Sequence, residues 1–171
     1  MEYPNHTFCR YLNLPKVPED LIREVIDSYP TTKEMAEVSK FKKSFKTTPS
    51  GEEYPSYAWS DQNNKKINEW CQKNICEDMY FAFHMIQSDE NGYFDIHRDY
   101  PVRQKLVYLI DPGGGTPITT FYDEDRQTVL QSISIETHRW HVMDVSAWHE
   151  VTGLEPGTVR FAIASRLFPG G

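Results

Sequence analysis

From residue 79 to residue 168 the sequence consists of short apolar stretches separated by turn signals, and this pattern constrains the fold more than any other feature. The turn signals include "DPGGG" and "LEPGT". They mark turns because glycine tolerates positive φ and proline fixes φ. The stretches predicted as strands are residues 79–87, 93–97, 104–111, 116–122, 129–135, 139–145 and 158–167. No helical pattern separates them, so the sequence favours a sandwich, jelly roll or barrel over a sheet built from βαβ units.

The first 78 residues have a different pattern, in which two amphipathic helices are expected. "PEDLIREVIDSYP" starts with Pro18 near an acidic first turn and stops before Pro30. "SDQNNKKINEWCQKNI" offers Ser60 or Asp61 as an N-cap. The apolar stripes of the two helices are Leu21, Ile22, Val25 and Ile26, and then Ile67, Trp70, Cys71 and Ile75. Residues 41–58 between them show no period, so we expect a loop there, either a surface loop or a lid.

Length and charge limit the classes of protein that fit this chain. Its 171 residues match one domain, 1–171, in which residues 1–78 support a β-rich core at 79–168. The net charge of -7 leaves no broad cationic surface, so no nucleic-acid partner is expected. The 3 cysteines follow no CxxC spacing and are expected to be reduced. The first residues, "MEYPNHTFCRYLNLP", show no basic start followed by an apolar core, and no apolar run approaches ~20 residues, so we expect a cytoplasmic protein without a membrane partner.

Two metal-competent side chains, His97 and Asp99, lie one residue apart ahead of the apolar run at 104–111. In an extended segment the side chains at i and i+2 point the same way, so an imidazole and a carboxylate can reach one point while Arg98 faces elsewhere. A strand end held by hydrogen bonds would use the same two residues. The pair alone therefore leaves both interpretations open.

A metal centre needs a third ligand from a distant strand, and four histidines can be weighed for it: His84, His138, His141 and His149. His84 lies in "YFAFHMI", where a core or strand-face position is the simpler interpretation, and His138 and His141 lie in or beside the strand expected at 139–145. His149 lies in "SAWHEVTG", where a loop or strand start can direct an imidazole inward, so it is the best candidate. Two histidines and one carboxylate suit non-haem Fe(II), although zinc tolerates the same ligands.

Arg160 follows His149 by eleven residues, beyond a Pro-Gly turn and inside the last predicted strand. It shares a strand face with Ala162 and Ala164, whose small side chains leave room beside it. A guanidinium that faces a cavity needs an anion, and a carboxylate matches its fork of donors. We therefore expect Arg160 to bind a carboxylate.

The motifs "HRD", "AWHEV" and "GTVRFAIASRLF", in this order, resemble those of the Fe(II)- and 2-oxoglutarate-dependent dioxygenases, most closely the prolyl-4-hydroxylase-like group. The resemblance covers residues 79–168 and implies a mainly β (α+β) fold, with a double-stranded β-helix (jelly roll) as catalytic core and N-terminal supporting helices. "KLVYLIDPGGGTPITTFY" is similar to the family's strand after HxD, with Ile-Asp at 110–111 where many relatives have Leu-Asn. "MIQSDENGYFDIH" lacks a Tyr that some relatives carry before HxD.

The resemblance implies Fe(II) at His97, Asp99 and His149, with O2 and 2-oxoglutarate as co-substrates. Arg160 and Tyr108 would hold the distal carboxylate of 2-oxoglutarate. The implied reaction hydroxylates a C–H bond of a protein prolyl or other residue, or of a free amino acid or small metabolite, and converts 2-oxoglutarate to succinate and CO2. Candidate substrate contacts, each with a surface or packing role as the alternative, are Arg98, Tyr100, Trp148 and Arg166.

Two other classes of protein stay open. A cupin-like metal enzyme would use the same ligands without 2-oxoglutarate, and Arg160 would then be a structural ion-pair partner. A jelly-roll binding module would use His97 and Asp99 only to hold a turn. Arg160 together with Tyr108 speaks against the first, and the order of the three ligands speaks against the second.

Overall fold

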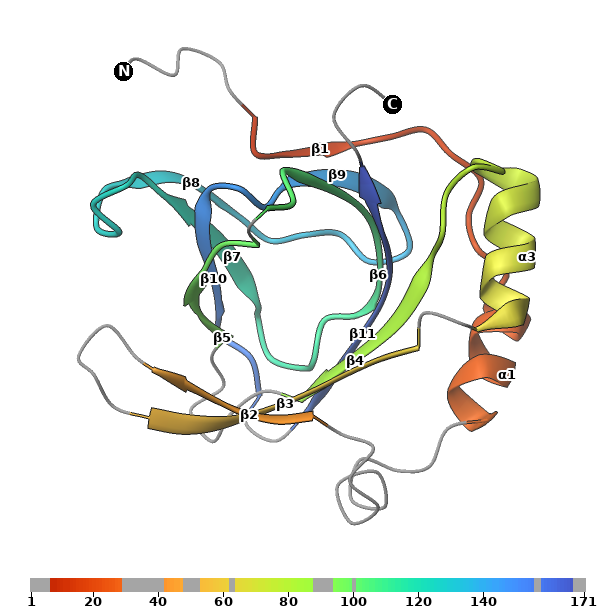
Figure 1. The fold of residues 1–171 in the computed structure, drawn as a ribbon, viewed down its shortest axis with the longest axis horizontal. Helices are drawn as coiled ribbons and strands as arrows, with labels where there is room; N and C mark the ends of the chain where they lie inside the picture. The colour runs from red at the N-terminus through yellow and green to blue at the C-terminus, as the bar shows by residue number, and fades with distance from the viewer. Residues whose placement is uncertain are drawn as a thin grey trace.

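The computed structural model describes residues 7–28, 42–47, 53–61, 64–87, 94–99, 101–155 and 158–167. These residues form two antiparallel β-sheets that face each other, with two helices beside the larger sheet (Figure 1). The larger sheet, called here the major sheet, has the strand order β1-β9-β6-β11-β4-β3-β2. The minor sheet has the order β5-β10-β7-β8. Two opposed sheets of this kind form a double-stranded β-helix and confirm the predicted mainly β jelly-roll fold.

Each predicted strand overlaps an observed one. The strands of the major sheet are β1 (Cys9–Tyr11), β2 (Lys42–Thr47), β3 (Glu53–Asp61), β4 (Ala82–Gln87), β6 (Gln104–Asp111), β9 (Trp140–Asp144) and β11 (Val159–Leu167). Those of the minor sheet are β5 (Phe94–His97), β7 (Ile118–Tyr122), β8 (Val129–Ile133) and β10 (Trp148–Thr152). The short β1 and the partly polar β10 are strands that the sequence pattern did not predict, because neither has a run of alternating apolar residues.

The prediction of a loop at residues 41–58 is wrong for the part of this segment that the structure describes, because that part forms two strands. β2 pairs along its whole length with the first six residues of β3, and the last five residues of β3 pair with β4. The backbone of β3 gains a ladder of hydrogen bonds from β4, and this gain does not depend on apolar alternation in the sequence. The segment therefore extends the major sheet at one edge.

Both predicted helices are present, as α1 (Glu19–Ser28) and α3 (Lys65–Asn74). The N-cap of α3 is Asn64, whose side chain accepts a hydrogen bond from the Ile67 backbone N–H at 3.0 Å. The predicted caps, Ser60 and Asp61, are instead paired with β4 as the end of β3, so the cap prediction is wrong. Within the described residues, no helix is both long and apolar enough to cross a membrane.

The main hydrophobic core lies between the helices and the major sheet. Buried residues of α1 and α3, among them Val25 and Ile67, pack in one cluster with side chains from the strands. The strand residues of this cluster include Phe83, Leu106, Tyr108, Ile110, Trp140, Val142 and Ile163, and Phe81, just before β4, also belongs to it. A smaller cluster lies between the two sheets and contains Phe8, Cys9, Leu109, Phe121 and Ile135. The major sheet thus has an outer face toward the helices and an inner face toward the minor sheet.

Two turns meet at one end of the sheets. Gly115, in the turn between β6 and β7, has φ +64, and a Cβ added there would overlap the Gly153 carbonyl oxygen. Gly153, between β10 and β11, has φ +76, and its added Cβ would lie 2.5 Å from the Thr116 oxygen. The Thr116 N–H donates a hydrogen bond to Gly153 O at 2.9 Å. The turns approach so closely, at positive φ, that only glycine fits these two positions.

Candidate active site

The three predicted metal ligands lie next to one another on the minor sheet. His97 ends β5 and pairs in register with His149 of β10, and the centroids of the two imidazole rings are 4.4 Å apart. The Nε2 atom of His97 is 3.7 Å from Oδ1 of Asp99. The structure therefore brings the three side chains together, from two strands that are far apart in the sequence.

Asp99 is held from two sides. Its backbone N–H donates to the Val145 carbonyl at 2.8 Å, and Lys105 Nζ donates to its Oδ2 atom at 2.5 Å. Burial acts to raise the pKa of the carboxyl group, but the charge and hydrogen bond of Lys105, with a smaller contribution from His97, lower it below the usual value. Asp99 is therefore a carboxylate, with Oδ2 bound to Lys105 and Oδ1 on the side of His97.

His149 is oriented by a backbone carbonyl. Its side chain is buried, and Nδ1 lies 2.9 Å from Ala147 O. A carbonyl oxygen can only accept, so Nδ1 carries the proton and Nε2 keeps its lone pair. Burial, with the nearby His97, lowers the pKa of His149 to about 4, so the imidazole is neutral at pH 7. A neutral imidazole held through its second nitrogen is the usual form of a histidine that binds a metal.

The donor types fit a divalent metal, although the side chains do not form a finished coordination shell. Within the described ranges, no group of three or more His, Cys, Asp or Glu residues has the geometry of a metal site. Oδ1 of Asp99 faces His97, and Oδ2 of Asp99 forms an ion pair with Lys105. The fit therefore rests on the two-histidine, one-carboxylate donor set and on its proximity, and side-chain rotation would be needed to bring the donors to one point.

Arg160 lies on the inner face of β11, near the end where the glycine turns meet. Its Nη1 atom donates to the Pro112 carbonyl at 3.2 Å. Burial lowers the pKa of the guanidinium to about 10, and the nearby Asp111 partly offsets this effect, so Arg160 is a cation at pH 7. Within the part of the chain that the structure describes, it makes no salt bridge. A cation placed in this way retains donors for an anionic ligand.

Tyr108 lies on the face of the major sheet opposite Arg160, so the structure does not bring these two predicted co-substrate contacts together. It pairs with Ile163 of β11, and both side chains belong to the core on the outer face. Its ring centroid is 5.0 Å from that of Trp140, and its side chain is fully buried. Neighbouring residues of a strand alternate between faces, so it is Leu109, paired with Ala162, that faces the same side as Arg160.

Of the four predicted substrate contacts, two lie away from the candidate metal ligands. The Arg98 guanidinium stacks 4.6 Å from the ring centroid of Trp148 and pairs with Glu124 at 3.2 Å. Trp148 also donates to Glu124, on the side of β10 opposite His149. Arg98, Trp148 and Glu124 thus form a cluster on the outer side of the minor sheet, away from the candidate metal ligands, and the role of Arg98 and Trp148 as substrate contacts stays a prediction. Tyr100 lies outside the described residues.

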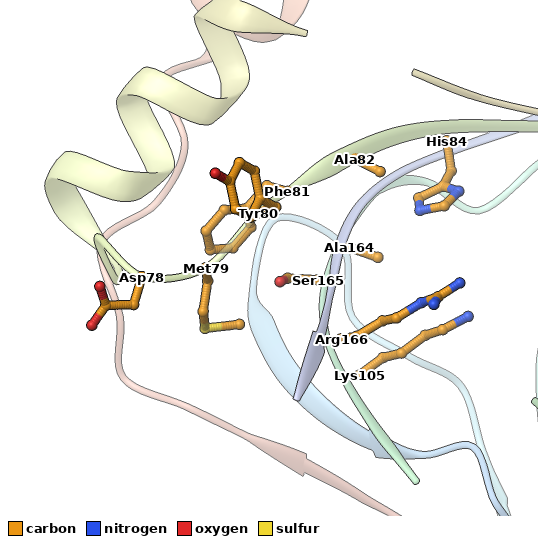
Figure 2. A pocket seen from close by; sticks show the side chains of 10 residues that line it. All are labelled: Asp78, Met79, Tyr80, Phe81, Ala82, His84, Lys105, Ala164, Ser165 and Arg166. Carbon is orange, nitrogen blue, oxygen red and sulfur yellow. The ribbon is translucent and has the colours of Figure 1, made fainter. Parts of the chain in front are cut away.

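Arg166, the fourth predicted contact, does lie on the inner face, beside a lysine that sequence reasoning missed. Arg166 of β11 pairs in register with Lys105 of β6. Figure 2 shows their side chains extending side by side, with His84 on the same side of the sheet. Lys105 is the residue that holds Asp99. The signal for Lys105 was a single charge inside the otherwise apolar "KLVYLI", which marks a buried charge that needs a partner.

Comparison with solved structures places the fold in a known class. A prolyl-4-hydroxylase from Pseudomonas putida matches 95% of this chain and 93% of its own, with a TM-score of 0.55 and 12% identity. A prolyl hydroxylase from Trichoplax adhaerens, solved with a peptide fragment of the hypoxia inducible factor oxygen degradation domain, matches 96% of this chain and 84% of its own, with a TM-score of 0.58 and 12% identity. SnoN, a non-heme alpha ketoglutarate dependent epimerase from nogalamycin biosynthesis, matches 91% of this chain and 76% of its own. The TM-score is 0.52 and the identity is 7%.

These likenesses are likenesses of fold, because the identities are 7% to 12%. No protein-family model and no curated protein matches the sequence. The chain has the double-stranded β-helix fold found in the prolyl hydroxylases and in other 2-oxoglutarate and Fe(II) oxygenases. Its chemistry must be argued from its own residues.

Proposed function

We propose that the protein is an Fe(II)- and 2-oxoglutarate-dependent dioxygenase that hydroxylates a C–H bond. The observation that carries the proposal is the combination of two opposed sites. His97, Asp99 and His149 meet on the minor sheet, and Arg160 presents a cation without a salt-bridge partner, among the described residues, from the inner face of the major sheet. The first is a donor set for Fe(II), and the second suits a carboxylate.

His149 and His97 would bind the metal through imidazole nitrogens, and Asp99 through Oδ1. Ala147 O fixes the tautomer and ring orientation of His149, and Lys105 fixes one oxygen of Asp99. Such outer partners determine ligand orientation as much as the ligands themselves do. When bound, Fe(II) would supply the activation of O2 coupled to the decarboxylation of 2-oxoglutarate to succinate and CO2.

Arg160 would hold the distal carboxylate of 2-oxoglutarate. The partner that we expected for it, Tyr108, lies on the other face of the sheet, so the grip depends on Arg160 and on groups near it. Ala162 and Leu109, adjacent in register on the inner face, supply an apolar surface without competing charge. A fixed guanidinium in a partly buried site positions the ketoacid and binds it through charge-assisted hydrogen bonds.

The position of Arg160 also bears on the two alternatives. A cupin-like enzyme without 2-oxoglutarate would use this arginine in a structural ion pair, yet no carboxylate within the described residues lies at salt-bridge distance from it. A jelly-roll binding module would not need His97, Asp99 and His149 to lie together, since it would not bind a metal. The dioxygenase is therefore the function that these contacts support best, with a small-molecule or peptide substrate.

The test is anaerobic addition of Fe(II) and 2-oxoglutarate to the purified protein. We expect the weak visible charge-transfer band that a ketoacid gives when it chelates Fe(II). The band should vanish in His149→Ala and should need more 2-oxoglutarate in Arg160→Gln. A wild-type protein without the band, or an undiminished band in His149→Ala, would contradict the proposal.

A further inference from the structure

We propose that the cavity beside Lys105 and Arg166 is the substrate subsite of this enzyme and that it recognises a carboxylate on a small substrate. The inference rests on the proposed function, because it takes the neighbouring Asp99 as a metal ligand. It adds the chemical class of the substrate, which neither the fold nor the candidate ligands specify.

The cavity has a volume of about 270 Å³ and lies at the end of the major sheet where β6 begins and β11 ends. Figure 2 shows the charged ends of Lys105 and Arg166 on one side of it, together with His84, and the side chains of Met79 and Tyr80 on the other. The methyl groups of Ala82 and Ala164, which are paired in register, lie between these two groups. The small alanines leave the room that a ligand needs.

Positive charge exceeds negative charge at this end of the inner face. Lys105 is bound to Asp99, but Arg166 makes no hydrogen bond or salt bridge within the described residues. Burial lowers the pKa of His84 to about 4, so the ring is neutral and adds no charge. The nearby Lys105 and Arg166 also lower this pKa, and Asp99 acts in the opposite direction. Two cations side by side repel each other, and an anion between them would remove that repulsion.

This subsite is separate from the one proposed for 2-oxoglutarate. Arg160 and Arg166 lie on the same face of β11 but six residues apart, which in a strand corresponds to about 20 Å between Cα atoms. One five-carbon dicarboxylate cannot occupy both. Lys105 links the Arg166 end directly to Asp99, so a carboxylate held there lies beside the candidate metal centre on the side opposite the co-substrate.

A carboxylate fits this site better than other anions do. The planar fork of Arg166 pairs with the two oxygens of a carboxylate, and Lys105 has donors left beyond the one used by Asp99. The chain has a net charge of -7, which repels a phosphate dianion more than a monoanion. Asp78, the acidic residue of the lining, lies at the far end of the cavity in Figure 2, away from the two cations.

The experiment uses the full chain with Zn(II) in place of Fe(II) and with saturating 2-oxoglutarate, so that the Arg160 site is filled. Propionate and its neutral analogue propionamide are titrated separately, and the arginine side-chain N–H signals are followed by NMR. We expect propionate to shift the Arg166 signal in a saturable manner and propionamide to leave it unchanged. Arg166→Gln should weaken propionate binding about 10- to 100-fold, and Arg166→Lys should restore part of it.

Arg10→Gln, which removes an exposed arginine from β1, is the matched control and should bind propionate like the wild type. No saturable shift at Arg166, or equal effects of Arg10→Gln and Arg166→Gln, would overturn the inference. A loss of 2-oxoglutarate affinity in Arg166→Gln as large as in Arg160→Gln would also overturn it, because the cavity would then belong to the co-substrate.

The two proposals fail in different ways. If wild-type protein gives the charge-transfer band with Fe(II) and 2-oxoglutarate but shows no propionate binding, only the substrate subsite is refuted. If the band is absent, the dioxygenase proposal fails, whatever propionate does. Once a substrate is found by its stimulation of 2-oxoglutarate consumption, Arg166→Gln should raise its KM about 10- to 100-fold with a smaller effect on kcat.

Discussion

Four strands of the major sheet, β4, β6, β9 and β11, carry different kinds of side chain on their two faces. The outer face presents large apolar groups to the helices, and the inner face presents polar and charged groups to the minor sheet. The outer set includes Phe83, Tyr108, Trp140 and Ile163, and the inner set includes His84, Lys105, His141, Arg160 and Arg166. The difference shows that the stability of this fold and its chemistry are separated by strand alternation, one residue apart along each strand.

Burying the inner set costs free energy, because histidine rings and cations lose hydration there. Burial lowers the pKa values of His84 and His141 to about 4, which is the direction that this cost predicts, and it does the same for His149 on the facing minor sheet. The apolar core on the outer face supplies the compensating free energy. Substitutions on the two faces should therefore affect different measurements.

The largest effect is expected for His149→Ala on the inner side of β10. Loss of an outer partner of a ligand already reduces activity 10- to 100-fold, so loss of the ligand itself should reduce 2-oxoglutarate turnover to below about 1%. Succinate formation measures this. Trp148→Phe, the neighbouring change on the outward side, should retain turnover, and equal loss in both variants would contradict the separation of faces.

Trp140→Ala on the outer face should act on stability instead. The indole is fully buried, makes an edge-to-face contact with Phe81 and a tilted ring contact with Tyr108, and donates to Pro15 O at 2.8 Å. Its removal should lower the free energy of unfolding by about 3–5 kcal/mol, measured by urea denaturation. A loss below about 1 kcal/mol would show that this cluster is not the main source of stability.

Arg160→Gln tests the inner face without removing a metal ligand. Affinity for 2-oxoglutarate should fall about 10- to 100-fold, because a charge-assisted pair is lost. The free energy of unfolding should stay the same or rise, since a largely buried cation with no ion pair among the described residues is removed. Arg160→Lys should recover part of the affinity. A marked loss of stability with unchanged affinity would indicate a structural arginine.

His141, on the inner face, should make the free energy of unfolding depend on pH. Burial, with a smaller contribution from Arg160, lowers its pKa from 6.5 to about 4, while the backbone carbonyl of Arg139 acts in the opposite direction. Below pH 6.5 the unfolded chain takes up a proton that the folded chain does not, so stability falls as the pH is lowered toward 4. The metal-free protein should lose about 1–2 kcal/mol from this residue between pH 7 and pH 5, and urea denaturation of His141→Gln should show a correspondingly smaller loss.

The smallest effect is expected for Tyr108→Phe. Within the described residues the Tyr108 hydroxyl is buried and makes no hydrogen bond of standard geometry, although the backbone of Val17 lies close enough to act on its pKa, so its removal should change the free energy of unfolding by no more than about 1 kcal/mol. Affinity for 2-oxoglutarate should not change. A tenfold loss of affinity in this variant would instead support the role first predicted from sequence.

Local patterns were enough to predict seven of the observed strands and both helices, because alternation along one segment decides these features. That His149 would lie beside His97 and Asp99 was an expectation from the resemblance to the dioxygenases, and it depends on the pairing of β5 with β10. The role of the three ligands stays a prediction. The position of Tyr108 was not predictable in the same way. Which face of β6 meets Arg160 depends on the pairing of β6 with β11, and this ladder contains an irregularity between Phe161 and Ala162. A shift of one residue exchanges the two faces of a strand.

β2, β3 and the Lys105–Asp99 contact were missed for a related reason. The pairing of β3 with β4 is a backbone property that no side-chain period announces. Lys105 was visible as a charge in an apolar strand, but its partner six residues earlier is reached only through the turn of the chain after β5. Long-range register and loop geometry decide these contacts, whereas sequence periodicity describes single segments.

The glycine contact between the two turns sets where this fold can change its loop lengths. Gly115 and Gly153 meet through their backbones, so an insertion in one turn would require a matching change in the other. Arg160 follows directly after the second of these turns, and a longer turn would move it along β11. Variation in this end of the sheet is thus restricted to paired changes. At the opposite end, where Lys105 and Arg166 line the cavity, the segment between β5 and β6 is likewise tied to the turn between β9 and β10, because Asp99 N–H donates to Val145 O and the Val145 and Ser146 N–H groups donate to Arg103 O. Changes of loop length there would also have to come in pairs.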